Sequence, residues 1–256
     1  MAGAGKGGGC LMGWLPVYKR EMRMLVRRIG GLGYLFSGLL FPIIYLLAFG
    51  WGLGESVQVA GGYIAFLAKG MLSITVMMNS FQQTVISISS ARFYYRNFQT
   101  LRMSPVSEAS LALGLTLAGM TRGVAAVLII ALAAWLFFGA AVLSLPGVAG
   151  LLLTSLCFGA LGVAVGMSIK GQEQFSIVIN FLITPMTFFC GSFFPVSNLP
   201  ELVQSVVRYL PLSLSNQLLR LAGWDAGGLC SAAILLAMTA AIFMWSVHRI
   251  RNYSEF

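Results

Sequence analysis

The side chain most able to do chemistry in this sequence is Arg122, which lies in an apolar run long enough to cross a membrane. A charge placed there costs at least a few kcal/mol unless it faces a water-filled cavity or polar neighbours. The preceding apolar run offers such neighbours in Asn79, Gln82 and Gln83. Two interpretations are open. These four residues line a translocation path in which Arg122 meets an anionic group of a substrate, or Arg122 bonds helix carbonyls and the amides as an internal contact.

The second unusual feature is a polar segment between two apolar runs, RFYYRNFQTLRMSPVS, residues 92–107. Drawn as a helix, it collects polar side chains on one face, with Arg102 at its edge: Arg92, Arg96 and Gln99. The opposite face carries Tyr94, Phe98 and Leu101. Pro105 ends the helix, because proline lacks an N–H and clashes with the preceding turn. Such a basic amphipathic helix can lie on the bilayer surface or offer a docking face to a soluble partner.

Composition assigns the chain to the polytopic membrane proteins. Hydrophobic residues make up 58% and charged residues only 9% of its 256 residues, whereas roughly 25% of a soluble domain is charged. A soluble fold of this length has too little interior to cover that much apolar surface. The net charge of +9 is therefore best interpreted by position, as a topology signal.

Several kinds of site are not expected. The four cysteines are scattered without a Cys-x-x-Cys pair, and His248 is the one histidine, so neither a metal site nor a disulfide framework is predicted. Gly5-Lys6 lacks the rest of a phosphate-binding loop. The predicted spans hold no Asp or Glu well inside them, which argues against two alternatives, an intramembrane enzyme and an ion-coupled secondary transporter.

The predicted fold is an all-α polytopic membrane protein with a single transmembrane domain, 1–256. A flexible tail, 1–16, precedes an amphipathic interface helix, 17–30, in which Tyr18, Met22 and Leu25 face away from the basic residues. Six transmembrane helices follow, each near the roughly 20 residues that a bilayer requires: 32–51, 62–90, 107–138, 148–169, 173–194 and 227–247. The polar helix occupies 92–105. Prolines divide the apolar segment 195–222 into short pieces, which predicts external or re-entrant helices.

The distribution of Lys and Arg predicts that both termini are cytoplasmic. With the N-terminus inside, most of the 16 basic residues fall on the cytoplasmic side: Lys6, Lys19, Arg20, Arg23, Arg27, Arg28, Arg92, Arg96, Arg102, Lys170, Arg249 and Arg251. Only Arg208 and Arg220 fall outside. Lys69 lies in the outer part of the second span, where its long stem could reach the interface.

Three sequence blocks resemble the ABC-2-type permeases, the membrane subunits of ATP-binding-cassette exporters. The polar segment ends in LRMSPVS, 101–107, similar to the family's connector signature, although Gln99 and Thr100 stand where the family usually has a glutamate. The block FLITPMTFFCGSFFPVSNLP, 181–200, is similar to the family's fifth span and its exit. The third block continues this match with YLPL, 209–212, and QLLR, 217–220.

The resemblance implies the permease subunit of an exporter that moves a lipid-linked polysaccharide or a hydrophobic or amphipathic compound out across the bacterial inner membrane. Two copies of a separate ABC ATPase would bind ATP and Mg, because this chain has no nucleotide site, and a second permease copy would complete a homodimer. The polar helix would then be the coupling helix that docks on the ATPase, through Arg92, Tyr94, Tyr95, Arg96, Phe98, Gln99, Leu101, Arg102 and Pro105.

Overall fold

The architecture is helical throughout the part of the chain that the computed structural model describes, residues 13–29, 40, 42–49, 52, 62–95, 98, 106–139 and 143–253. Within these ranges, four helices are long and apolar enough to cross a membrane. They are α3 (Tyr63–Ser89) with its extension to Tyr94, α5 (Glu108–Phe138), α6 (Leu145–Ser168) and α11 (Ala226–Arg251). Four of the predicted spans are thus confirmed as helices to within a few residues at each end, and the total of six remains a prediction.

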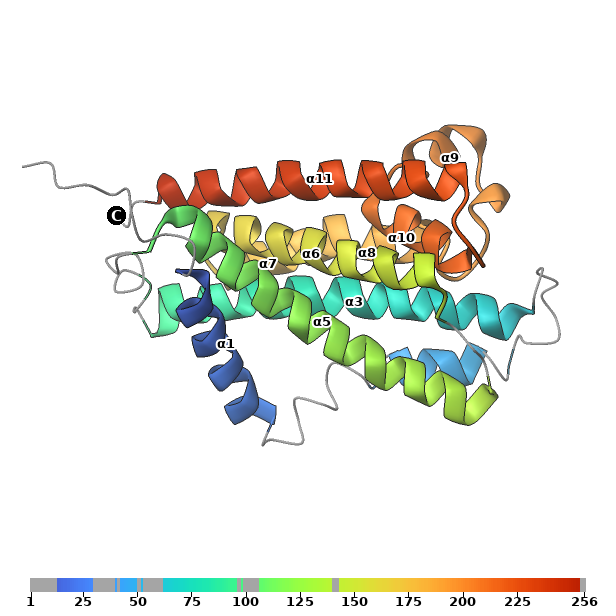
Figure 1. Ribbon diagram of the computed structural model, residues 1–256, viewed down its shortest axis with the longest axis horizontal. Helices are drawn as coiled ribbons and strands as arrows, with labels where there is room; N and C mark the ends of the chain where they lie inside the picture. Colours follow the sequence, from blue (N-terminus) through green and yellow to red (C-terminus); the bar gives the residue numbers. More distant parts are fainter. Residues whose placement is uncertain are drawn as a thin grey trace, which may run out of the picture.

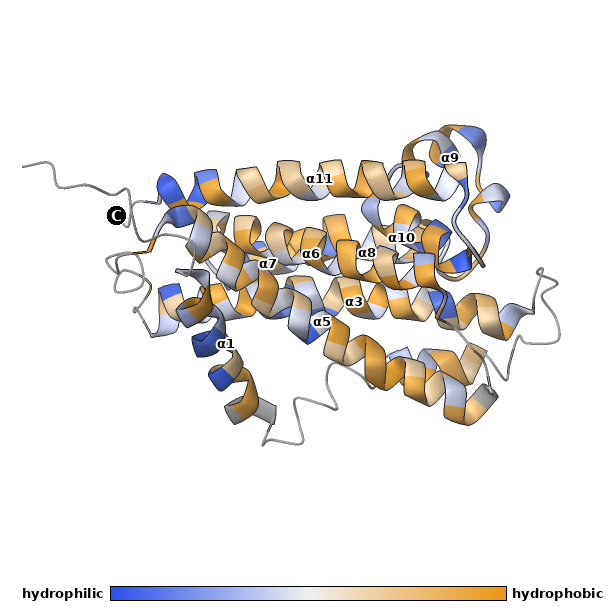
Figure 2. Cartoon of the chain, in the orientation of Figure 1, coloured by the Kyte–Doolittle hydropathy of each residue, from blue (hydrophilic) through white to orange (hydrophobic). Residues whose placement is uncertain are grey.

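The long helices lie along the molecule, with α5 running opposite in direction to α3, α6 and α11, and α6 packs against the other three (Figure 1). Small residues on α6 permit this close packing. A Cβ added at Gly162 would lie 2.9 Å from the carbonyl oxygen of Phe81 on α3, and one at Gly159 would lie 2.9 Å from the carbonyl oxygen of Thr116 on α5. Apolar residues predominate along the bundle and hydrophilic ones gather at its ends, as a membrane-spanning protein requires (Figure 2).

The two ends of the bundle differ in what they carry. One end, here named the α1 end, holds α1 (Trp14–Ile29), the end of α3, the start of α5 and the ends of α6 and α11 (Figure 1). The opposite end, named the α9 end, holds the short helices η3 (Val196–Asn198), α9 (Glu201–Val207) and α10 (Pro211–Arg220). The segment 195–222 thus contains short helices, and their assignment as external or re-entrant helices remains a prediction.

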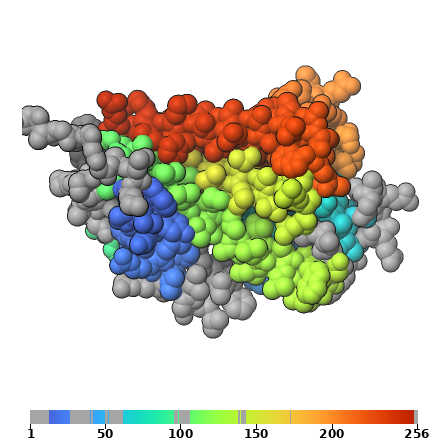
Figure 3. Space-filling model, in the orientation of Figure 1, coloured from blue at the N-terminus to red at the C-terminus, as the bar shows by residue number. Residues whose placement is uncertain are grey.

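The outward surface of the long helices is apolar. In Figure 3 one face of the molecule is formed by α1, α5, α6 and α11. The exposed side chains on α5 and α11 include Leu128, Leu132, Trp135, Leu236 and Met244. Water would penalise such a surface, but lipid chains would not.

The predicted fifth span, 173–194, is not one regular helix. It consists of α7 (Gln172–Val178), the π-helical turn η2 (Ile179–Ile183) and α8 (Thr184–Phe189). Pro185 explains the wide turn, because its ring lacks an N–H and clashes with the carbonyl one helical turn earlier. The helix also ends earlier than predicted, and Gly191 in the turn that follows has a φ of +76°, which favours glycine.

The polar segment 92–105 does not begin a new helix at residue 92. Residues Ser90–Tyr94 form the π-helical turn η1, which continues α3, and the chain bends at Tyr95. A helical wheel drawn through 92–105 as one regular helix is therefore wrong at its start. Phe98 is helical, but the other residues from 96 to 105, most of the first span 32–51 and most of the tail 1–16 lie outside the described residues.

Candidate functional site

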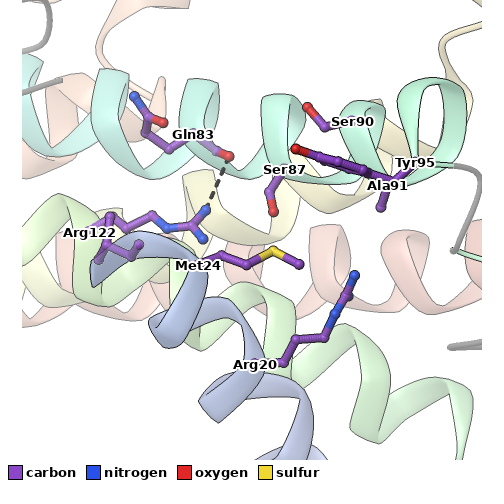
Figure 4. A pocket seen from close by; sticks show the side chains of 9 residues that line it. Arg20, Met24, Gln83, Ser87, Ser90, Ala91, Tyr95 and Arg122 are labelled. Atoms are coloured by element: carbon purple, nitrogen blue, oxygen red, sulfur yellow. Dashed lines mark hydrogen bonds between the residues drawn. The ribbon is translucent and has the colours of Figure 1, made fainter. Parts of the chain in front are cut away.

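Arg122 makes a buried ion pair with Glu21 of α1. Its Nη2 donates to Glu21 Oε2 at 2.8 Å, and its Nη1 donates to the carbonyl oxygen of Gln83 on α3 at 3.2 Å (Figure 4 shows the second bond). The same Oε2 accepts a hydrogen bond of 2.6 Å from the hydroxyl of Ser87 on α3. Glu21 is only 2% exposed. This carboxylate therefore connects α1, α3 and α5.

The carbonyl contact of Arg122 agrees with one of the two interpretations left open by the sequence. Its acidic partner Glu21 was not predicted, because it lies outside the predicted spans. A signal for Glu21 is nevertheless present. It is the one acidic residue in α1, and helical spacing places it between Tyr18 and Leu25, on the face opposite the basic residues. Tyr18 confirms the orientation of that face, since its hydroxyl lies 3.0 Å from Thr121 Oγ1 on α5.

The depth of this pair follows from the length of α5. With 31 residues, α5 is about 46 Å long, about 16 Å longer than a hydrocarbon core of roughly 30 Å. Arg122 lies 14 residues after Glu108 (122 − 108), about 21 Å along the helix. If the surplus length projects at the α1 end, Arg122 lies only about 5 Å inside the hydrocarbon boundary.

The other predicted path residues form a half-buried polar stripe on α3. Asn79, Gln82 and Gln83 are followed at helical spacing by Ser87 and Ser90. The side-chain amides of Asn79 and Gln82 donate to atoms of their own helix, the Thr75 carbonyl oxygen at 3.0 Å and the Met78 sulfur at 3.5 Å. The structure thus places these amides along α3 and brings only the Gln83 carbonyl to Arg122.

A small cavity lies between α1, α3 and α5, where the polar stripe reaches the α1 end of the bundle. Its lining includes Arg20, Gln83, Ser87, Tyr95 and Arg122 (Figure 4). Its volume of about 20 Å³ holds roughly one water molecule. In this conformation the stripe is therefore closed to a large solute at Arg122. No group of three or more His, Cys, Asp or Glu side chains comes together in the described part of the chain.

The predicted coupling residues divide into anchored and exposed ones. Arg92 Nη1 donates to the carbonyl oxygens of Gly166 at 2.6 Å and Ile169 at 2.9 Å, and thereby binds the end of α3 to the end of α6. Phe98 is 1% exposed. Tyr94 and Tyr95, by contrast, are 81% and 58% exposed.

Phe98 is anchored in an apolar cluster that joins most of the helices at the α1 end. Its ring packs edge-on against Tyr253, with 5.4 Å between ring centroids, and the Arg92 guanidinium lies 4.8 Å from the same tyrosine ring. The cluster contains residues of α1, α3, α5, α6 and α11: Val17, Ile88, Leu111, Ala112, Leu115, Val163, Met167 and Ile250. A displacement of the polar segment would therefore reach five helices through Phe98. Arg96, Gln99, Leu101, Arg102 and Pro105 lie outside the described residues.

Comparison with known proteins decides the family. A family model described as ABC-2 type transporter matches residues 17–222, most of the 256 residues. The chain belongs to the ABC-2 type transporter family. The resemblance seen in the sequence is thereby confirmed. The match begins in α1 and ends just after α10, so it includes the Glu21–Arg122 pair, the polar segment and the short helices of the α9 end.

Several curated relatives of this ABC-2 family member cover most of its length. Nodulation protein J of Rhizobium leguminosarum bv. trifolii is 31% identical over 219 residues, which cover 82% of this chain and 80% of that protein. Nodulation protein J of Rhizobium meliloti is 30% identical over 234 residues, with coverages of 87% and 88%. The inner membrane transport permease YadH of Escherichia coli is 26% identical over 202 residues, with coverages of 78% and 76%.

Membership in the ABC-2 family establishes the general role of the chain. Members are the membrane subunits of ABC transporters, and the ATPase activity lies in a separate subunit. The chain is accordingly a membrane-spanning transporter subunit from a family whose members work with an ABC ATPase partner.

Proposed function

We propose that this chain is the permease subunit of an ABC exporter and that its α1 end receives the ATPase. One observation carries the proposal. At that end two neighbouring tyrosines, Tyr94 and Tyr95, are exposed, while Phe98, three residues after Tyr95, is buried in an apolar cluster that includes residues of five helices. Exposed aromatic side chains are favoured at protein interfaces, and the buried phenylalanine provides a mechanical link to the bundle.

In the proposed mechanism, closure of the ATPase dimer displaces the polar segment, and the displacement passes through Phe98 and Arg92 to the long helices. Arg92 fixes the end of α3 to the end of α6 through two carbonyl bonds, so these two ends would move together. Glu21 adds α1 to the same unit through Ser87 and Arg122. ATP binding then changes the relative stability of two arrangements of the bundle, which is a population shift.

The proposed path for the exported compound follows the polar stripe on α3 and includes Arg122, Asn79, Gln82 and Gln83. In this proposal the gap at Arg122 widens when the bundle changes state, because one water molecule fills the present cavity. The proposed cargo is a lipid-linked polysaccharide or another hydrophobic or amphipathic compound. Its amphipathic character matches a path with polar side chains on one helix and apolar surface around it.

The proposed assembly is two copies of this chain, joined as a homodimer, with two ATPase subunits that bind ATP and Mg. We place it in the bacterial inner membrane with both termini in the cytoplasm. The basic side chains of α1 support this orientation, since α1 and the end of α11 lie at the same end of the bundle (Figure 1).

The test is co-purification in detergent of the tagged chain with a candidate ABC ATPase from the same genome, expressed together with it. Tyr94→Glu places a charge on the exposed surface of the α1 end, and we expect it to reduce recovery of the ATPase at least tenfold. Tyr209→Glu is the matched control, because Tyr209 is a 59% exposed tyrosine between α9 and α10, at the α9 end. A second variant, Arg96→Glu with Leu101→Asp, changes the polar segment on both sides of Phe98.

Equal recovery of the ATPase with wild type, Tyr94→Glu and Tyr209→Glu would contradict docking at the α1 end. The wild-type chain could instead recover no ATPase and, reconstituted in vesicles, accumulate a solute when an ion gradient is applied. That result would replace this proposal by the alternative of an ion-coupled secondary transporter. Turnover of a lipid by the purified chain alone would instead favour the intramembrane-enzyme alternative.

A further inference from the structure

Three cationic side chains at the α9 end line a single cavity of about 650 Å³. Lys69 comes from α3, Arg208 from the end of α9 and Arg220 from the last residue of α10. The cavity falls within the range of about 300–1,000 Å³ typical of ligand pockets. Arg208 and Arg220 are the two basic residues that the charge distribution assigns to the outer side, and Lys69 is the basic residue in the outer part of the second span.

Convergence of these charges needs a reason, because basic residues are usually depleted on the outer side of a membrane protein. The ion pairs seen among the described residues, Arg20–Glu21 and Arg122–Glu21, lie at the other end of the molecule and do not involve the three cations of the cavity. None of the side chains that line the cavity is acidic. Like charges brought together without an anion repel one another. The cavity is therefore complementary to a negative group.

Arg220 is held in place as a preformed part of the cavity. Its Nη2 donates to the carbonyl oxygen of Gly191, and its guanidinium lies 3.8 Å from the centre of the Phe66 ring. Its Nε is buried without a hydrogen-bond partner among the described residues. Burial lowers the pKa of the Arg220 guanidinium to about 10, so the group stays charged at neutral pH.

The remaining lining fits a group that is anionic at one end and apolar at the other. Gln204 and Gln217 contribute amides, while Phe66, Pro195 and Val196 contribute apolar surface. Guanidinium and ammonium groups together bind phosphate oxygens through charge-assisted hydrogen bonds. Because these cationic groups lie beside apolar side chains, the cavity matches the phosphate headgroup of a lipid, with its attached acyl chains, better than it matches a free phosphate ion.

We propose that this cavity binds the phosphate group of an anionic lipid, with Lys69, Arg208 and Arg220 as its ligands. The inference rests on the proposed function only for placing the α9 end on the outer side of the membrane. On that basis the site would receive a phosphate-bearing lipid in the outer leaflet. The same oxyanion chemistry could also retain inorganic phosphate, so the experiment includes both sources.

The experiment measures binding to the purified chain in a neutral detergent, without the ATPase. The probes are short-chain phosphatidic acid, phosphatidylcholine of the same chain length, and inorganic phosphate. Binding of each probe is measured by native mass spectrometry and by the shift in the thermal midpoint of the protein. We expect wild type to bind phosphatidic acid more tightly than either other probe. Arg208→Gln should weaken that binding about tenfold, the loss of one charge-assisted hydrogen bond, and Lys69→Gln should act similarly.

The matched control is Lys170→Gln, which removes one exposed positive charge at the α1 end. Arg208 is exposed, so its substitution tests binding without disturbing a buried residue. Unchanged affinity in both Arg208→Gln and Lys69→Gln overturns the site, as does an equal loss in Lys170→Gln, which would indicate a net-charge effect. Inorganic phosphate binding as tightly as the lipid would overturn the lipid assignment. Because no ATPase is present, these results are independent of whether the chain is an exporter subunit.

Discussion

The Glu21–Arg122 pair gives the sharpest quantitative prediction for the substitution Arg122→Met. The change removes the guanidinium 2.8 Å from Glu21 Oε2 and leaves a carboxylate that is 2% exposed. What remains is the hydroxyl of Ser87 at 2.6 Å and a longer contact of 3.7 Å to Arg20. Removing one partner of a buried ion pair costs about 3–5 kcal/mol, because the charge that stays behind keeps only its weaker contacts. We expect the free energy of unfolding to fall by that amount.

The assay is a double-mutant cycle with Arg122→Met, Glu21→Met and the double variant, unfolded by SDS in mixed micelles and followed by tryptophan fluorescence. Replacing both charges by apolar groups leaves no buried charge, so the double variant should be more stable than either single variant by about 2 kcal/mol or more. Arg208→Met, on an exposed residue, should change stability by about 0.5 kcal/mol or less. If the two single effects simply add, the pair does not couple α1 to α5 and the reasoning is refuted.

Two further changes concern the packing of α3 and α10 against the turn after α8. Gly70→Ala would place a Cβ in steric overlap with the carbonyl oxygen of Ser192, so it should lower the thermal midpoint at a cost of about 1–3 kcal/mol. Gly223→Ala, which meets nothing within 4 Å, should leave that midpoint unchanged. Asn216→Ala removes the bond of 2.9 Å to the buried Cys190 carbonyl and should cost about 1–3 kcal/mol. A midpoint equal to that of wild type for Gly70→Ala or Asn216→Ala would contradict the packing described.

The long apolar helices could be predicted because their signal is local. Length and composition alone define a span, and the caps agree with the predicted starts, as at Ser107, whose side chain accepts from the Ser110 N–H at the first turn of α5. The interface helix was recognisable from its two faces, and its predicted start at Val17 is three residues later than the observed start at Trp14. Pro16 stands in the first turn, where proline is tolerated.

The long-range contacts could not be predicted from local pattern. Glu21 and Arg122 are 101 residues apart, and nothing in the sequence near either one specifies the other. The convergence of Lys69, Arg208 and Arg220 on one cavity likewise depends on how α3, α9 and α10 pack. The helical wheel of the polar segment failed for a different reason. A π-helical turn and a bend at Tyr95 change the phase, so Tyr94 and Phe98 do not share a face.

The most direct test of the central claim is site-specific crosslinking between the permease and its ATPase in native membranes. The exposed Cys230 and the N-terminal Cys10 are both replaced by serine. A single new cysteine is then introduced as Tyr94→Cys or Tyr209→Cys and labelled with a photoreactive maleimide. We predict that the label at position 94 forms a crosslink to the ATPase and that the yield of this crosslink changes when a non-hydrolysable ATP analogue is added. We predict no crosslink from position 209. An adduct from position 209 alone, or from neither position while the two proteins still co-purify, would contradict docking at the α1 end.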